Sequence, residues 1–233
     1  MVCFLASDSP TTRRRSELFI KAIPAWVAET NAYVVADEPG GQAVVVDAPP
    51  DPEKVGAYLA EIDVSLVGII LTHGHIDHSG GAGYLARTTG AVTYVHPDDD
   101  FLTKHPQEQL EAIFGMTPPG EYELPKRFEN LTDGQSLEIG PVTVEVRQTP
   151  GHTPGHCCFY WESEGVLFSG DQLFAGSIGR TDLPGGSWQQ LMDSMRERVM
   201  VLDDEVKVLP GHGPETDIGR ERRTNPFRQD WAS

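Results

Sequence analysis

The chain has 233 residues, enough to bury a sizeable core in one large domain or in two similar halves. Its formal net charge of −17 comes from 35 acidic and 18 basic residues, which argues against nucleic acid or an anionic membrane as a partner. A small anionic substrate remains compatible with this charge, because bound metal ions and a few local cations can reverse the field inside one cleft.

The sequence predicts neither a membrane anchor nor a secretory signal. It contains no run of about 18 uninterrupted apolar residues, and the basic cluster at 13–15 is not followed by the apolar core of a signal peptide. The three cysteines suggest no disulfide framework, because their number is odd and two of them are adjacent. We therefore predict a cytoplasmic protein with an N-terminal tail over 1–16 and a single domain over 17–233, in an oligomeric state that the sequence leaves open.

The first half of the chain alternates apolar runs with turn residues. Val-rich runs on either side of a Pro-Gly-Gly turn predict a hairpin. An Asp-Pro pair at 51–52 predicts the start of a helix, since Pro is favoured in the first helical turn. The expected elements are a hairpin of two strands, a helix, a strand, a helix and a strand, over 32–36, 43–47, 51–62, 66–71, 80–89 and 92–95.

A different segment, residues 98–127, follows these elements. It holds short helical patterns and no long apolar stretch, so we predict a flap beside the active site. Asp98, Asp99 and Asp100 are interpreted as a solvated helix start rather than a cation site.

The second half returns to strands. They are predicted over 136–139, 142–148, 157–161, 166–169 and 206–209, with an amphipathic helix over 188–202 before the last of them. Cys157 and Cys158 are expected to be buried in one of these strands rather than to form a thiol centre. The two series of strands and helices predict an α/β fold in which two similar halves face one another.

The strongest chemical signal is Thr72-His73-Gly74-His75-Ile76-Asp77-His78, where a predicted buried strand ends. Four ligand-type side chains fall within six positions, so a compact loop can direct them into one cleft. Imidazole suits zinc or iron, and a carboxylate adds negative charge for a divalent ion. The alternative is a solvated polar turn, but the chain has only eight histidines, so three in six positions favour a metal site.

Three further ligand-type residues follow predicted strands: His152, Asp171 and His212. Each stands next to a glycine, which lets the backbone turn sharply at the strand end. Either histidine alone could equally be a metal ligand or an ordinary loop residue. Together with the first motif, the three predict a metal site at one rim of the sheets.

The order H-x-H-x-D-H, His, Asp, His resembles that of the metallo-β-lactamase superfamily, over about residues 17–228. The resemblance implies a four-layer αβ/βα sandwich, with two mixed sheets flanked by helices and the metals at one edge. It implies that one metal is held by His73, His75 and His152, and the other by Asp77, His78 and His212. Asp171 would bridge the two metals, and the residues that would support the ligands without binding metal are Asp47 and His156.

The implied chemistry is metal-assisted hydrolysis by two divalent ions, with zinc expected and iron or manganese also accepted. A water between two metals about 3.5–4 Å apart loses a proton near neutral pH and becomes the hydroxide nucleophile. One metal would polarise the substrate carbonyl and stabilise the oxyanion. Asp77, which could orient the hydroxide, and Asp171 are the predicted catalytic residues.

Two regions resemble the glyoxalase II-like branch, whose members hydrolyse thioesters of glutathione: Gly176–Asp182, and Gly211–Pro214 together with Thr224–Phe227. Longer members of that branch bind the glutathione carboxylate through a basic residue of the first region, so Arg180 is the candidate substrate-binding residue. The alternative for Arg180 is an ion pair with Asp182 or another acid. The longer enzymes also carry a tyrosine after the last histidine and a C-terminal helical region with more basic residues. Gly213 stands at the tyrosine position here, which leaves glutathione recognition open.

Other activities stay open at this point. A branch of mononuclear-iron persulfide dioxygenases resembles this chain in the Gly-Arg-Thr-Asp of 179–182 and uses the equivalents of His73, His152 and Asp171. Lactonases and β-lactamases use a similar site with different walls, although the missing signal peptide disfavours a secreted β-lactamase. A non-catalytic relative is disfavoured because every expected ligand is present. We predict a metal-dependent hydrolase that acts on a small-molecule thioester resembling hydroxyacylglutathione.

Overall fold

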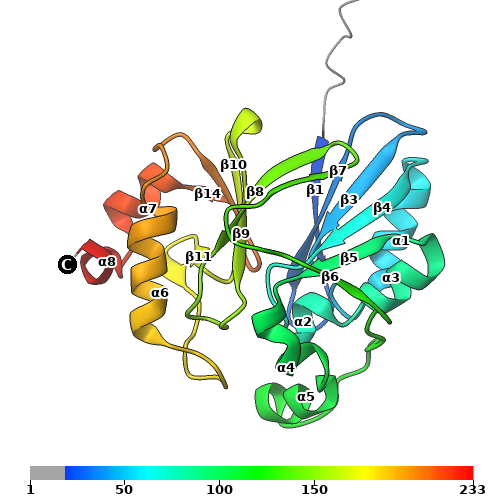
Figure 1. Ribbon diagram of the computed structural model, residues 1–233, viewed down its shortest axis with the longest axis horizontal. Helices are drawn as coiled ribbons and strands as arrows, with labels where there is room; N and C mark the ends of the chain where they lie inside the picture. Colours follow the sequence, from blue (N-terminus) through cyan, green and yellow to red (C-terminus); the bar gives the residue numbers. More distant parts are fainter. Residues whose placement is uncertain (1–18, 233) are drawn as a thin grey trace, which may run out of the picture.

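The structure, a computed structural model, describes residues 19–232, which form two six-stranded sheets that face one another (Figure 1). The predicted tail, residues 1–16, lies outside the described residues. In spatial order the first sheet is β1 (Phe19–Ala25), β2 (Thr30–Ala36), β3 (Gln42–Val46), β4 (Ser65–Ile70), β5 (Val92–Val95) and β6 (Phe128–Asn130). The second is β14 (Thr216–Asp217), β13 (Lys207–Pro210), β10 (Val166–Gly170), β9 (Cys157–Trp161), β8 (Val142–Gln148) and β7 (Ser136–Ile139).

Both sheets are mixed. In the first, β1 to β3 are antiparallel, whereas β3 to β6 pair in parallel. In the second, β10 and β13 are parallel and the remaining pairs are antiparallel. A small hairpin of β11 (Leu173–Phe174) and β12 (Ser177–Ile178) follows β10. Because the strands that carry predicted ligands at their ends run in one direction, their ends can meet at one edge.

The central strands are apolar on both faces because both faces are covered. Val35 of β2 packs against the opposite sheet, while its neighbour Val34 faces the helices outside. The adjacent cysteines show the same alternation in β9: Cys157 lies between the sheets and Cys158 lies under the outer helices. Both are fully buried, as predicted.

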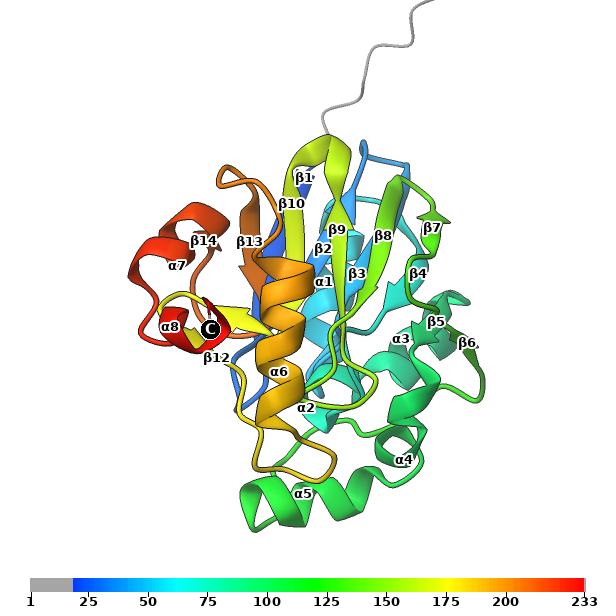
Figure 2. The same cartoon turned by 60° about the vertical axis from the view of Figure 1, so that its left-hand side comes forward.

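Helices form the two outer layers, so the predicted four-layer α/β architecture is confirmed (Figures 1 and 2). The first sheet is covered by α1 (Pro52–Glu61) and α3 (Ala82–Thr89). The second is covered by α6 (Trp188–Ser194), its continuation η3 (Met195–Val199), α7 (Ile218–Thr224) and α8 (Arg228–Ala232). The predicted helix over 188–202 therefore exists, but its second part has π-helical hydrogen bonding. Among residues 19–232, no helix is both long and apolar enough to cross a bilayer.

The segment predicted as a flap folds into short helices at one end of the sandwich. These are η1 (Pro97–Asp99), α4 (Asp100–Thr103) and α5 (Pro106–Phe114), and they pack next to α2 (Ile76–Ser79) (Figure 2). The segment thus lies against the helix that carries Asp77 and His78 of the histidine motif. Three edge strands of the large sheets, β1, β6 and β14, were missing from the sequence prediction. In β1, Lys21 and Pro24 interrupt the apolar pattern, and β6 and β14 have only three and two residues.

Candidate metal centre

The predicted ligands come from segments far apart in the chain and meet at one end of the two sheets. His73 and His75 lie in the loop after β4, and His152 follows β8. Asp171 comes directly after β10, and His212 after β13. Gly211 allows this approach, since a Cβ there would lie 2.4 Å from Asp171 Oδ1.

One group of possible ligands consists of three imidazoles. His73 Nε2 lies 3.1 Å from His75 Nδ1, and His75 Nδ1 lies 2.9 Å from His152 Nε2. All three rings are buried. Their inward nitrogens surround a single point, as a trigonal face of a metal site requires.

A second group joins Asp77, His78 and His212. His212 Nε2 lies 3.3 Å from His78 Nε2 and 3.3 Å from Asp77 Oδ2. Asp171 lies between the two groups, with Oδ1 3.3 Å from His78 Nε2 and Oδ2 3.4 Å from His152 Nε2. The structure therefore brings all seven predicted ligands together, with Asp171 in contact with both groups.

The ring nitrogens that face away from this point have fixed partners. His78 Nδ1 lies 2.8 Å from Asp47 Oδ2, His152 Nδ1 lies 2.7 Å from the Arg180 carbonyl, and His212 Nδ1 lies 3.1 Å from the Ala28 carbonyl. These oxygens accept a hydrogen bond from the outward N–H, so the inward Nε2 of the neutral ring presents a lone pair to a cation. Hydrogen bonding of this kind orients histidines that bind metals.

Asp47 organises the histidine loop from behind. Its carboxylate accepts hydrogen bonds from the Thr72 backbone N–H at 2.7 Å and from the Thr72 hydroxyl at 2.8 Å, in addition to its contact with His78. Asp47 is buried and has a φ of 60°, a conformation that costs a non-glycine residue energy. This strain is tolerated because the hydrogen bonds fix the carboxylate beneath the loop.

The electrostatics of the first group favour neutral rings. Burial lowers the pKa of His73 well below its ordinary value, and neighbouring imidazoles lower it further. Burial likewise lowers the pKa of His75 to about 3, with His152 contributing. Both rings are therefore neutral at physiological pH, which is the form that binds a metal.

The second group and Asp171 pair ionised carboxylates with imidazoles. Burial alone would raise the pKa of Asp77 and of Asp171, but His78 and His212 outweigh it and lower both pKa values. Burial would lower the pKa of His78, but Asp171, Asp77 and Asp47 outweigh it and raise that pKa. These ionised carboxylates stabilise the protonated form of His78. They would stabilise a divalent cation in the same way if it replaced that proton.

The donor set fits divalent metals. Two ligands bound to one zinc at about 2.1 Å in a tetrahedron lie about 3.4 Å apart, close to the 3.1 Å and 2.9 Å found between the inward nitrogens. Asp171 Oδ1 is buried without a hydrogen bond of good geometry and faces His78 Nε2 at 3.3 Å, so a divalent cation shared by these two atoms would compensate its charge.

Two residues of the flap hold the histidine loop and were not identified from the sequence. Asp99 was interpreted as solvated, and this was wrong: it is fully buried and accepts hydrogen bonds from Gly74 N, Thr153 Oγ1 and Gly155 N. It therefore ties the loop of His73 and His75 to the loop after His152. Gln109 of α5 accepts from Ile76 N at 2.9 Å and donates to the Gly74 carbonyl at 3.2 Å. No spacing rule marks either residue, because both act through the tertiary packing of the flap.

His156 and Arg180 lie beside the cluster and belong to neither ligand group. His156 Nδ1 lies 2.8 Å from Thr149 Oγ1, and its Nε2 accepts a hydrogen bond from the Asp171 backbone N–H at 3.0 Å. The ring thus fixes the backbone of Asp171.

The Arg180 side chain is 55% exposed and makes a bidentate ion pair with Asp182, with both N–O distances 2.7 Å. It also lines the pocket over the cluster, so the ion pair and the predicted contact with substrate are compatible.

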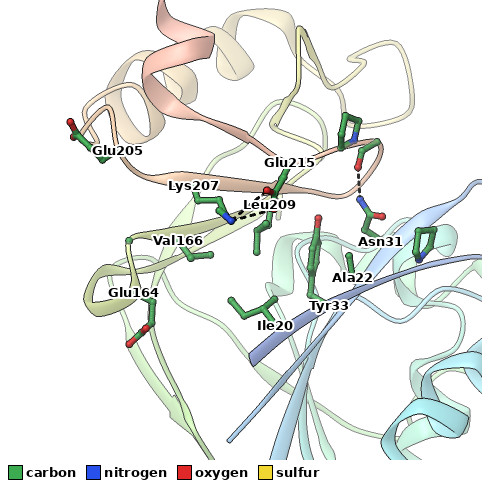
Figure 3. A pocket seen from close by; sticks show the side chains of 14 residues that line it. Ile20, Ala22, Asn31, Tyr33, Glu164, Val166, Glu205, Lys207, Leu209 and Glu215 are labelled. Carbon is green, nitrogen blue, oxygen red and sulfur yellow. Dashed lines mark hydrogen bonds and ion pairs between the residues drawn. The ribbon is translucent and has the colours of Figure 1, made fainter. Parts of the chain in front are cut away.

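The cluster opens into a pocket of about 370 Å³ between the flap, the β11–β12 hairpin and the His212 loop. A larger cavity of about 780 Å³ lies behind that loop, between the edges of the two sheets (Figure 3). No histidine lines this second cavity, and its Lys207 pairs with Glu215. Asn31 in its wall donates hydrogen bonds to the Pro210 and Gly213 carbonyls, so this region supports the His212 loop. The smaller pocket, by contrast, is lined by five of the seven predicted ligands: His75, Asp77, His152, Asp171 and His212.

The family model of the metallo-beta-lactamase superfamily matches residues 25–212, and the chain belongs to this superfamily. Its relatives include a hydroxyacylglutathione hydrolase, GloC, of Haemophilus influenzae, which is 36% identical over 89% of this chain and 97% of its own length. A probable metallo-hydrolase of Bacillus subtilis, YqgX, is 32% identical over 89% of this chain and 96% of its own.

Solved structures agree with this assignment. The B3 metallo-beta-lactamase BLEG-1 superposes with a TM-score of 0.83 at 36% identity, covering 90% of this chain and 99% of its own. TTHA1623, solved in a di-iron-bound form, has a TM-score of 0.79 at 36% identity, covering 89% and 99%. ETHE1 from Myxococcus xanthus has a TM-score of 0.70 at 27% identity, covering 91% and 88%. The chain thus has the fold and the His/Asp metal-binding arrangement of a metallo-hydrolase.

Proposed function

We propose that this metallo-hydrolase cleaves thioesters resembling hydroxyacylglutathione. The observation that carries the proposal is the complete second group, Asp77, His78 and His212, held together with Asp171 beside the three-histidine group. A mononuclear oxygenase has no need of that second group, whereas hydrolysis by two metals does. The similarity to GloC along almost its whole length supports the thioester as the substrate class.

In this proposal His73, His75 and His152 hold one divalent ion, while Asp77, His78 and His212 hold the other. Asp171 contacts both groups and would bridge the ions, and we propose zinc as the native metal. Bound there, the two ions would supply a water of lowered pKa as nucleophile and an electrophile for the thioester carbonyl. The donor set also suits iron, and TTHA1623 was solved with two irons.

The protein's own residues would then position the reactants. The ionised carboxylate of Asp77 can accept a hydrogen bond from the attacking hydroxide and so orient a lone pair toward the substrate. Ile113 and Phe114 of the flap, with Phe174 of the hairpin, line the pocket and limit the access of other water. Asp47 and His156 hold His78 and Asp171 in place.

Arg180 is the proposed contact for a substrate carboxylate. Its exposed guanidinium lies at the pocket wall, and its partner Asp182 is 67% exposed and can be exchanged for a substrate carboxylate at little cost. We expect Arg180→Ala to raise KM for an anionic glutathione thioester about tenfold more than KM for a neutral thioester of the same acyl group. Equal effects on the two substrates would reject this role.

A persulfide dioxygenase is the second candidate, because the Gly-Arg-Thr-Asp of residues 179–182 resembles that branch of the superfamily. The two are separated by measuring the metal content and, in parallel, the hydrolysis of S-lactoylglutathione and oxygen uptake with glutathione persulfide. Two metal equivalents with thioester turnover support our proposal; one iron with oxygen uptake would overturn it. Nitrocefin turnover tests the β-lactamase alternative, to which BLEG-1 belongs by name.

We also propose a cytoplasmic enzyme with a small-molecule substrate and with neither nucleic acid nor a membrane as partner. The support is the net charge of −17, which repels phosphate-rich surfaces. Weak, salt-independent retention on heparin and on anionic vesicles would be the expected result, and tight salt-dependent binding to either would contradict it.

A further inference from the structure

An apolar chamber adjoins the metal pocket. It has a volume of about 250 Å³ and shares His75, Ile113 and Leu183 with the lining of the pocket. Its remaining walls come from the flap and from the loop before α6: Phe101, Leu102, His105, Glu108, Gln109, Ala112 and Pro184. A group bound at the metal ligands can therefore extend directly into this chamber.

The chamber walls are fixed relative to the metal ligands. Gln109 donates to the Leu102 carbonyl at 2.8 Å and bonds to the backbone on both sides of His75, so the flap cannot shift without moving the histidine loop. On the other side, the ring of Phe101 lies against the loop after Pro184, since a Cβ on Gly185 would be 3.1 Å from Phe101 Cζ. The chamber is thus preformed, which favours tight binding of a group that fits it.

The chemistry of the lining selects an apolar group. Its large apolar side chains are Phe101, Leu102, Ile113 and Leu183, and no lysine or arginine is among the lining residues. The one carboxylate among the lining residues belongs to Glu108, whose Oε1 lies 3.3 Å from His105 Nδ1 at the rim of the chamber. Glutathione carries two carboxylates and finds no cation here, whereas Arg180 lines the metal pocket outside the chamber. The acyl half of a thioester is therefore the better occupant.

We propose that this chamber binds an aromatic or branched apolar substituent of the acyl group and so selects bulky acyl thioesters over the lactoyl thioester. This inference rests on the proposed thioesterase function. Pockets for drug-sized ligands begin at about 300 Å³, so a chamber of about 250 Å³ suits one ring or one branched chain. The methyl group of a lactoyl substituent would leave most of it unfilled, and the chamber would then contribute little to binding.

The test compares S-mandeloylglutathione with S-lactoylglutathione, which share the thiol and the α-hydroxyl and differ in a phenyl against a methyl group. We expect kcat/KM to favour the mandeloyl thioester at least about tenfold. Ala112 is exposed on α5 and lines the chamber, so Ala112→Trp would fill it and abolish this preference. The matched control is Glu111→Trp, an exposed neighbour that does not line the chamber, where the preference should persist.

Two further experiments distinguish an error in the chamber assignment from an error in the proposed thioesterase function. If Ala112→Trp instead impairs an S-lactoyl thioester of benzyl mercaptan, the chamber takes the thiol half and the acyl assignment is overturned. Binding of the product acids mandelate and lactate, measured by calorimetry on the metal-loaded protein, does not depend on turnover. Tighter binding of mandelate, lost in Ala112→Trp, would support the chamber even if no thioester were hydrolysed, in which case the proposed function alone would fall. Equal binding of the two acids would overturn the chamber.

Discussion

Replacing Asp99 with asparagine tests whether the flap holds the metal centre in shape. The carboxylate accepts three hydrogen bonds, with Gly74 N at 2.7 Å, Thr153 Oγ1 at 2.8 Å and Gly155 N at 2.7 Å. Oδ2 accepts the first two and Oδ1 the third. An amide keeps one oxygen acceptor, and its NH2 group cannot accept a bond, so the best orientation leaves the buried Gly155 N–H without a partner.

The expected loss of stability follows from this one N–H donor that lacks an acceptor. A buried donor that loses its acceptor costs about 1–3 kcal/mol, so we expect the free energy of unfolding to fall by about 2 kcal/mol. For a chain of this length that corresponds to about 4–8 °C in Tm. Because Asp99 links the loops that carry three imidazoles, metal affinity should fall as well, by about 10–100-fold as for other outer partners of metal ligands.

The assays are urea unfolding of the metal-free protein and competition with a chelator for the metal. The control is Asp98→Asn, because the Asp98 side chain is 57% exposed and its removal should change stability by less than about 0.5 kcal/mol. If Asp99→Asn matched this control in both stability and metal affinity, the assignment of Asp99 as the residue joining the two loops would be refuted.

Two more predictions concern the packing around the site. Gly211→Ala should lower the bound metal to less than half of the wild-type content, because its Cβ would lie 2.4 Å from Asp171 Oδ1 and 2.6 Å from His78 Cε1. Metal analysis of the purified variant checks this. The control is Gly56→Ala, which should retain the full metal content because no atom lies within 4 Å of its new Cβ. The second concerns thiols: burial raises the pKa of Cys158 to about 12 and that of Cys157 well above its ordinary value, so the reactive thiolate is scarce at any pH below these values. In a Cys3→Ser background, Ellman's reagent should label neither thiol in the native protein from pH 7 to 9 and both in urea, and rapid native labelling would contradict the burial.

Most strands and helices could be predicted from apolar runs, helical spacing and the turn residues that bound them, whereas the four-layer arrangement was implied by the family resemblance. The strands with continuous apolar sequence, such as β2 and β4, are buried on both faces, and this kind of pattern is hard to mistake. The edge strand β1 was missed because one side of it faces outward and its composition is mixed. The π-helical turn at Met195–Val199 was missed because side-chain spacing does not encode backbone hydrogen bonding.

The metal site was predictable for a different reason. His73, His75, Asp77 and His78 are close in sequence, and the remaining candidates each follow a strand, where the topology brings them to one edge. Asp99 and Gln109 could not be found in this way. Asp99 stands between Asp98 and Asp100 in a run of three aspartates. It is buried and hydrogen-bonded only because the flap packs on the histidine loop. Residues that act through tertiary contacts leave no local signal in the sequence.

The most direct test of this account is the number of metal ions that the purified protein holds, compared between the wild-type chain and Asp77→Ala. Asp77 belongs to the group with His78 and His212 and has no part in the three-histidine group. We therefore expect two equivalents in the wild type, one in the variant, and the loss of most hydrolysis with the second ion. A wild-type protein with one equivalent, or a variant with an unchanged metal count and rate, would contradict the central claim that seven side chains form a dinuclear hydrolytic site.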